Sequence, residues 1–169
     1  MKFYLSHPFQ SRKEVRSWEL WIEMTTGLVL VNPFYDLQRG DMPALDDPAT
    51  SREARSRAIS DFKALVNRDL DALFQCDAVV CVLPENTPAI GTICEAWEAC
   101  NLEIPIYFIT SEETAAHPWV RFMVERTGGA VFNTVESFRD SFLPKDVLRW
   151  IEQIHNTAWE NVAREGLDG

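Results

Sequence analysis

The sequence has few glycines, and none of the seven stands in a common nucleotide-binding or hydrolytic signature. There is no GxGxxG pattern, no Walker A loop and no GxSxG elbow. These absences exclude the usual dinucleotide-binding, NTPase and α/β-hydrolase mechanisms.

Cysteine is also scarce. The four cysteines, Cys76, Cys81, Cys94 and Cys100, form no CxxC pair, and no histidine stands at zinc-ligand spacing. We therefore expect no metal site and no cofactor. Since Cys81 falls in a predicted strand and Cys94 and Cys100 in a predicted helix, we interpret them as small core residues of a reduced protein.

Positive charge is in deficit, because 16 Lys and Arg face 26 Asp and Glu and give a net charge of -10. A sequence-independent grip on polymeric nucleic acid needs an excess of basic residues. That class of partner is excluded, whereas a single nucleotide in a local pocket is not. No apolar run could span a bilayer, and the chain starts with a predicted strand in place of a signal peptide. We expect a cytoplasmic protein with no membrane partner.

What is present is a regular alternation of buried strands and amphipathic helices. Strands are predicted at Lys2–Ser6, Leu28–Val31, Ala78–Leu83, Pro105–Ile109 and Ala130–Phe132. The alternation predicts a single-domain α/β protein over residues 1–169. We expect a Rossmann-like or flavodoxin-like three-layer sandwich, with a five-stranded parallel sheet of order 2-1-3-4-5.

The helices between these strands have recognisable ends. Capping boxes are predicted at Ser11–Glu14 and Thr50–Glu53, before stripes that carry Val15, Trp18, Ile22 and Thr25 in the first helix and Ile59, Phe62, Val66, Leu70 and Leu73 in the second. Gly27 is expected to end the first helix. A short helix is predicted from His117 to Glu125, and Pro144 suits the start of a last helix toward Ala163. The stretch from Phe34 to Ala49 shows no period, and long loops of this kind are often functional.

The segment from Asp77 to Cys100 is the most informative part of the chain. A buried strand is followed by a turn-rich loop, and Gly91 and Thr92 then open a helix with Glu95 in its first turn. Open α/β sheets bind ligands at such strand ends. Two interpretations of Glu95 stay open: a carboxylate that acts on a bound molecule, or the partner of a capping box at Thr92–Glu95.

Other polar residues admit two interpretations as well. Asp69 lies at the edge of the second helix's stripe and either leans into a cleft or is a solvated neighbour, whereas Asp71 points away. Tyr4 is either a core residue or a group that orients a carboxylate. His7 could contact an anion or lie in a loop. Arg12 and Arg16 could hold a phosphate at the start of the first helix or be solvated.

Four segments occur in an order that is typical of one family. They are FYLSHPF at residues 3–9, VNPFYD at 31–36, NRDLDAL at 67–73 and, most specifically, IGTICEAWEA at 90–99. Over most of its length the chain resembles the nucleoside 2-deoxyribosyltransferase family, which includes related nucleoside and nucleotide N-glycoside hydrolases. The resemblance implies that Glu95 is the nucleophile on the anomeric carbon, that Tyr4 positions this carboxylate, and that Asp69 binds the sugar hydroxyls.

The resemblance also implies the substrate side of the site. The candidate substrate-binding residues are Ser6, His7, Pro8, Phe34, Asp36, Gly91 and Thr92. The expected substrate is a small nucleoside or nucleotide, and the expected assembly is a homo-oligomer whose sites are completed at subunit contacts. The Trp and Phe content favours such contacts, and we expect Trp97 or the region from His117 to Met123 near the interface.

Two departures from the family pattern concern the base. Transferases usually carry an acid two residues before the glycine, where this chain has Ala89, and often take an asparagine from a neighbouring subunit, where this chain reads HPWVRFM. Base recognition must therefore differ. The first hypothesis is a deoxyribosyltransferase, the second an N-glycoside hydrolase of nucleoside 5′-monophosphates with Ser6, His7 or Arg12 near the phosphate, and the third a non-catalytic nucleotide-binding or sensing module.

Overall fold

The computed structural model describes residues 1–36, 51 and 62–149. Most of the aperiodic stretch after Phe34, the expected capping box at Thr50–Glu53, Ile59 of the expected stripe and the last helix beyond residue 149 lie outside the described residues. Within them, residues 145–149 are helical, as expected after Pro144. None of the helices in the described ranges is long and apolar enough to cross a bilayer.

The predicted sheet is confirmed: five parallel strands in the order β2-β1-β3-β4-β5. The strands are β1 (Lys2–Ser6), β2 (Val29–Val31), β3 (Ala78–Leu83), β4 (Ile106–Thr110) and β5 (Ala130–Phe132). The central strand β3 is buried on both faces, which explains its unbroken apolar run. Observed and expected strand ends differ by at most one residue.

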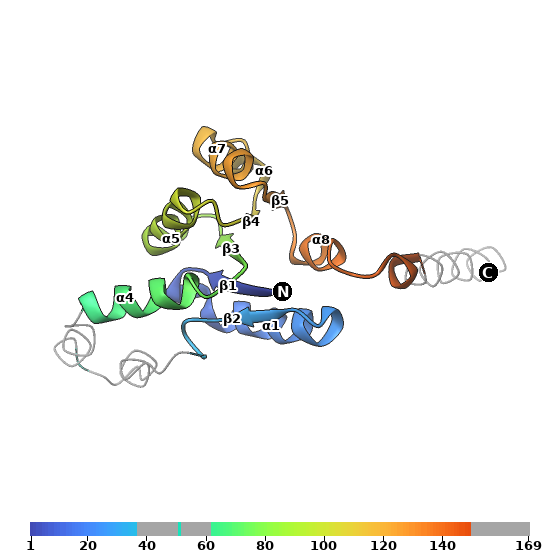
Figure 1. Ribbon diagram of the computed structural model, residues 1–169, viewed down its shortest axis with the longest axis horizontal. Helices are drawn as coiled ribbons and strands as arrows, with labels where there is room; N and C mark the ends of the chain where they lie inside the picture. The colour runs from blue at the N-terminus through green and yellow to red at the C-terminus, as the bar shows by residue number, and fades with distance from the viewer. Residues whose placement is uncertain (37–50, 52–61, 150–169) are drawn as a thin grey trace, which may run out of the picture.

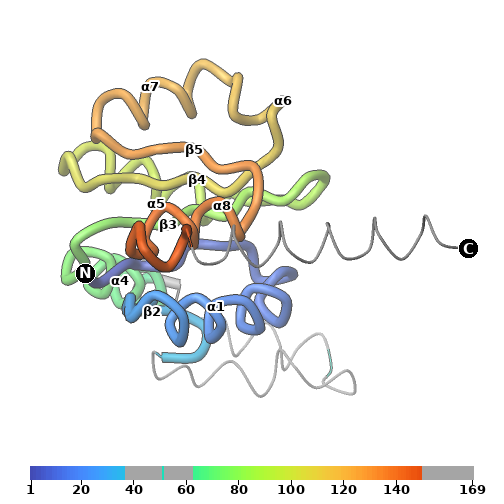
Figure 2. The backbone as a smooth tube through the Cα atoms, turned by 90° about the vertical axis from the view of Figure 1, so that its right-hand side faces the viewer, coloured from blue at the N-terminus to red at the C-terminus, as the bar shows by residue number. Residues whose placement is uncertain are grey.

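Helices cover both faces of this sheet, as Figure 1 shows. The described helices are η1 (Phe9–Ser11), α1 (Arg12–Thr26), α4 (Phe62–Leu73), α5 (Ile90–Asn101), α6 (Glu112–Ala115), α7 (Pro118–Thr127) and α8 (Val135–Asp140). Residues of α1 and α8 pack on one face, and residues of α4, α5 and α7 pack on the other. Figure 2 shows α6 and α7 along one side of the molecule, and α1 with β2 along the opposite side.

Alternate residues of each strand divide the core between the two faces. On β1, Phe3 and Leu5 point toward α1 and α8, whereas Tyr4 points toward α4, α5 and α7. This alternation follows from the period of two residues in a strand. It places the hydroxyl of Tyr4 and the side chain of Ser6 on the face that α5 covers.

The helix ends agree only partly with the sequence pattern. Gly27 and Gly128 end α1 and α7 in the left-handed conformation, with φ of 71° and 69°. Ser11 makes no side-chain cap, so the capping box predicted there is wrong. The reason is that η1 precedes α1 directly and already holds Ser11 in a helical conformation.

The buried stripe of α1 also differs from the expected one. Val15 and Ile22 are buried as expected, but Glu19 is fully buried while Thr25 is exposed. The stripe on α4 is thinner than expected, since Leu73 is buried but Val66 is half exposed. Cys94 is exposed on α5, so it is not a core residue, whereas the other three cysteines are buried.

The topology fixes where a ligand can bind. The connection from β1 leads outward to β2, whereas the next one returns across β1 to β3, so the strand order reverses between β1 and β3. Ligands of open α/β sheets bind outside the carboxyl ends of the strands at this switch point. The loops after β1, β2 and β3 meet there.

Candidate active site

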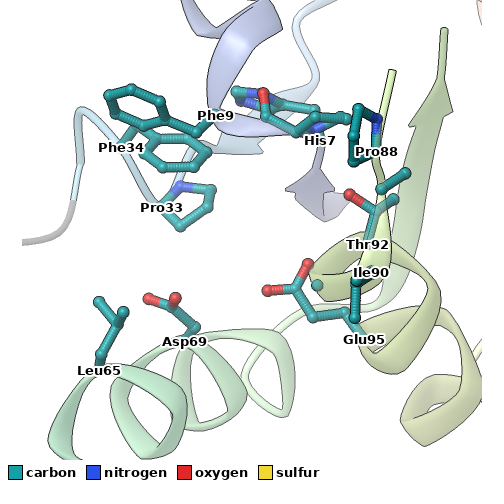
Figure 3. Close-up of a pocket in the computed structure, with 13 residues that line it drawn as sticks. His7, Phe9, Pro33, Phe34, Leu65, Asp69, Pro88, Ile90, Thr92 and Glu95 are labelled. Atoms are coloured by element: carbon teal, nitrogen blue, oxygen red, sulfur yellow. The ribbon is translucent and has the colours of Figure 1, made fainter. Parts of the chain in front are cut away.

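A pocket of about 450 Å³ lies at the switch point. Figure 3 shows three groups of side chains around it, from the loops after β1 and β2, from α4, and from the start of α5. Its lining residues are His7, Pro8, Phe9, Pro33, Phe34, Leu65, Asp69, Pro88, Ala89, Ile90, Gly91, Thr92 and Glu95. Seven of the ten candidate residues are among them, namely His7, Pro8, Phe34, Asp69, Gly91, Thr92 and Glu95.

Glu95 is held by two hydroxyl donors from β1. The Tyr4 hydroxyl donates a hydrogen bond to Oε1 of Glu95 at 2.8 Å, and the Ser6 hydroxyl donates one to Oε2. Tyr4 and Ser6 are both fully buried, whereas Glu95 lies partly exposed at the pocket. The structure therefore places the carboxylate at the boundary between a rigid strand and the pocket.

The interpretation of Glu95 as a capping-box partner is wrong. Helix α5 begins at Ile90, with Ala89 as its N-cap, so Glu95 lies in the second turn and not the first. Its carboxylate accepts hydrogen bonds from two side chains of β1, Tyr4 and Ser6. The start of α5 was predicted two residues too late because neither Pro88 nor Ala89 has a side chain that can cap a helix.

Asp69 faces Glu95 across the pocket. It comes from α4, its side chain is 15% exposed, and Figure 3 shows its carboxylate and that of Glu95 on the pocket side of two neighbouring helices. Its Oδ1 atom lies 3.9 Å from Nε of Arg68. The position suits a group that accepts hydrogen bonds from a ligand held between the helices.

The opposite wall of the pocket is aromatic. The ring of Phe34 lies 4.9 Å from the ring of His7 and 5.7 Å from the ring of Phe9, measured between centroids. Figure 3 shows these rings and Pro33 together above the two carboxylates. A flat heteroaromatic ring can stack on such a wall while a polar group reaches the carboxylates.

The start of α5 closes the third side. Thr92 is 2% exposed, and its hydroxyl has no hydrogen-bond partner among the described residues. Figure 3 shows this hydroxyl directed into the pocket, one helical turn before Glu95. A buried hydroxyl in this position can bond with a ligand.

Three candidate residues lie outside the pocket lining. Ser6 reaches Glu95 from behind the pocket wall. Asp36 accepts a hydrogen bond from the backbone N–H of Asn32 at 2.7 Å and lies 3.9 Å from Arg16, so it closes the turn after β2. Tyr4 lies beneath Glu95 and contacts it through the hydroxyl.

The two arginines considered for a phosphate have protein contacts. Nη1 of Arg12 donates to the carbonyl of Phe9 at 3.0 Å, and its guanidinium lies 3.7 Å from the centre of that ring. Arg16 donates to Glu19 and lies near Asp36. Neither arginine is among the residues that line the pocket.

A buried polar network supports the aromatic wall, and the sequence analysis missed it. Nδ2 of Asn32 donates to Glu19 at 2.6 Å, so Oδ1 of Asn32 faces the N–H of Phe34 at 3.0 Å and Nε2 of His7 at 3.3 Å. Burial lowers the pKa of His7, although hydrogen bonds with the Pro8 carbonyl and Asn32 partly offset this. Glu19 lies four residues after Val15 and three before Ile22. This spacing would have revealed that Glu19 is buried, although not that it contacts Asn32.

Burial raises the pKa of Glu19 from 4.5 to about 7, against the opposing effects of Asn32 and Arg16. The folded protein therefore keeps this proton up to about pH 7, whereas the unfolded chain releases it near 4.5. The free energy of unfolding should fall between these pH values, by on the order of 3 kcal/mol, and stay constant above them.

We expect the free energy of unfolding of Glu19→Gln to depend much less on pH between 4.5 and 7 than that of the parent protein. Chemical denaturation at pH 5 and pH 8 measures it, and Glu14→Gln on the exposed side of α1 is the control that should keep the parent behaviour. An identical pH dependence in Glu19→Gln and the parent protein would show that Glu19 is not the group responsible.

Comparison by sequence gives no match to a family model or to a curated protein. Solved structures give matches over most of the chain. A 2-deoxyribosyltransferase from the psychrotolerant bacterium Bacillus psychrosaccharolyticus is 17% identical, covering 88% of this chain and 96% of its own, with a TM-score of 0.55. This chain has the fold of a 2-deoxyribosyltransferase.

Two further structures share the 2-deoxyribosyltransferase fold. A conserved protein from Enterococcus faecalis V583 is 14% identical over 83% of this chain and 95% of its own, with a TM-score of 0.57. The CMP N-glycosidase BcmB from Clostridium botulinum is 14% identical over 83% and 96%, with a TM-score of 0.50. The resemblance that four short segments indicated is thus matched by the fold.

Proposed function

We propose that this protein is an enzyme that cleaves the N-glycosidic bond of a 2′-deoxynucleoside and transfers the sugar to another base. The arrangement of Glu95 carries the proposal, because a carboxylate held by Tyr4 and Ser6 opens into a pocket opposite Asp69. The shared fold with a 2-deoxyribosyltransferase supports it.

The proposed chemistry proceeds in two displacements at the anomeric carbon. An oxygen of Glu95 forms a bond to this carbon as the bond to the base nitrogen breaks, and the base departs with the electron pair and takes up a proton. The nitrogen of a second base then attacks the same carbon, gives up its proton to solvent, and releases the carboxylate. Both steps pass through an oxocarbenium-like state, which the negative charge of Glu95 stabilises.

In this proposal the sugar and the base of the substrate contact different walls of the pocket. The sugar would lie between Glu95 and Asp69, where Asp69 accepts hydrogen bonds from its hydroxyls. The base would stack on the wall of His7, Phe9 and Phe34. Ala89 lies at the pocket where transferases usually carry an acid. Apolar contact and stacking would therefore contribute more to base recognition here than hydrogen bonds to an acid.

The second candidate is an N-glycoside hydrolase of nucleoside 5′-monophosphates, which the shared fold with a CMP N-glycosidase favours. In that case water replaces the second base. A nucleotide-binding or sensing module would use the same pocket without turnover. Incubation with deoxynucleosides and deoxynucleotides, with and without a second free base, separates the three. New nucleoside means transfer, free sugar or sugar phosphate means hydrolysis, and binding without product means a sensor.

We also propose a cytoplasmic homo-oligomer, with an apolar surface on α5 and α7 as the subunit interface. This surface carries four exposed side chains, Ile93, Trp97, Trp119 and Phe122, and the two Trp rings lie 5.3 Å apart edge to face. A groove of about 600 Å³ between α4 and α5 continues from it to Asp69 and Glu95. A neighbouring subunit seated there would cover an open side of the site.

We expect the protein to sediment as a dimer or larger assembly at micromolar concentration, and Trp97→Glu to shift it toward monomer. A charge buried in an apolar interface is costly unless it is paired. Met24→Glu is the matched control, because Met24 is 80% exposed on α1, which covers the other face of the sheet. A parent protein that is monomeric under these conditions would contradict the proposed assembly.

A further inference from the structure

Ser6 contacts the carboxylate of Glu95 but takes no part of its own in the two proposed displacements. It is fully buried at the end of β1, and its hydroxyl donates to Oε2 of Glu95, whereas the Tyr4 hydroxyl donates to Oε1. It is not among the residues that line the pocket, so a ligand there would meet Glu95 and not Ser6. Its hydroxyl therefore acts on the carboxylate from behind.

Cys81 lies beside Ser6 in the sheet. The two residues are paired in register on the neighbouring strands β1 and β3. Complete burial raises the pKa of Cys81 well above its ordinary value, so this side chain stays a neutral thiol.

We infer that Ser6 is a positioning residue for Glu95, completing with Tyr4 a two-donor clamp on the carboxylate. The inference deepens the proposed function and rests on it for its catalytic consequence. A single donor would leave the carboxylate free to rotate about its terminal bond. Donors on both oxygens fix its plane.

The clamp has two physical effects. It holds the nucleophile in one orientation toward the anomeric carbon, which lowers the entropy that the reaction must lose. It also favours the ionised carboxylate, since hydrogen bonds to the charged form of an acid stabilise that form. Loss of the Ser6 hydroxyl should therefore slow the chemical step and move ionisation of Glu95 to higher pH.

The test compares the parent protein with Ser6→Ala and with Thr110→Val as a matched control. Thr110 is a buried residue of β4 whose hydroxyl donates to the carbonyl of Leu83 at 3.0 Å, with no link to Glu95. Both variants lose one buried hydroxyl from the same sheet. The first readout is the ¹³C resonance of the Glu95 δ-carboxyl through a pH titration, assigned by its loss in Glu95→Gln.

We expect the titration midpoint of Glu95 to rise in Ser6→Ala and to stay at the parent value in Thr110→Val. On a substrate that the parent cleaves, kcat should fall about 10- to 100-fold in Ser6→Ala with little change in KM, the range that one hydrogen bond to a charged group represents. The acid limb of its pH–rate profile should move in the same direction.

An unchanged midpoint in Ser6→Ala would overturn the clamp, whether or not the protein is active. An equal shift in Thr110→Val would also overturn it, because the effect would then belong to the sheet and not to the Ser6 hydroxyl. If the midpoint rises but the parent cleaves no N-glycosidic bond, the contact is supported and the proposed function fails. The titration therefore tests the clamp, and the activity assay tests the proposed function, independently of each other.

Discussion

Glu95→Ala should abolish turnover while the protein stays folded. The substitution removes the only group proposed to form a bond with the anomeric carbon, and loss of a covalent nucleophile costs several orders of magnitude in rate. Two buried hydroxyls lose their acceptor, but a partly buried charge disappears as well. The net change in the free energy of unfolding should therefore stay within about 1–2 kcal/mol. Product formation and thermal melting, measured on the same sample, separate the two effects.

Glu95→Gln and Glu98→Gln form the matched pair of controls. Both remove one negative charge from α5 and keep the shape of the side chain. Glu98 lies three residues further along the helix; it lines the groove between α4 and α5 but not the pocket of about 450 Å³. We expect Glu95→Gln to be nearly as inactive as Glu95→Ala, and Glu98→Gln to be as active as the parent. Near-normal turnover in Glu95→Ala would show that another group is the nucleophile.

The sheet could be predicted because its strands are continuous apolar runs. A strand buried on both faces, such as β3, needs apolar residues throughout, and this pattern is visible without any structure. The order of the strands followed from the alternation with helices and the handedness of the crossovers. The end of α1 at Gly27 could also be predicted, since a left-handed position favours glycine.

The short helices could not be predicted in the same way. Helix α6 has four residues and α8 has six, too few for an amphipathic period to show. The capping box of α8 pairs Thr134 with Ser137, where the sequence signature expects Glu or Gln. The predicted box at Ser11 failed because a helical turn already preceded it, which is a matter of tertiary placement and not of local pattern.

Some residues of the candidate site could be predicted from the sequence, and others could not. Glu95, Asp69 and Tyr4 could be named because they stand in recognisable segments at strand ends or beside buried stripes. The proline and leucine walls of the pocket carry no chemical signature, since Pro33 and Leu65 look like ordinary loop and helix residues. The buried network of Glu19 and Asn32 depends on a contact 13 residues apart, which a pattern on one helix does not specify.

Asp69→Ala should be the second most damaging change, with a fall of about 100-fold in kcat/KM on a 2′-deoxynucleoside. The proposed contact with a sugar hydroxyl holds the anomeric carbon in line with Glu95, and small misplacements of reacting groups cost about this much. Both kcat and KM should change, since the contact is made in the ground state and in the transition state. Asp71→Ala is the control, because Asp71 lies on the same helix and is exposed.

A substrate change makes the test specific to the hydroxyl. If Asp69 accepts a hydrogen bond from the sugar 3′-hydroxyl, the 2′,3′-dideoxynucleoside of the same base should be a poor substrate for the parent protein and nearly as poor for Asp69→Ala. The two changes remove the same interaction, so their effects on kcat/KM should not add. Full additivity in this double comparison would mean that Asp69 affects the reaction by another route, for example by holding α4 against α5.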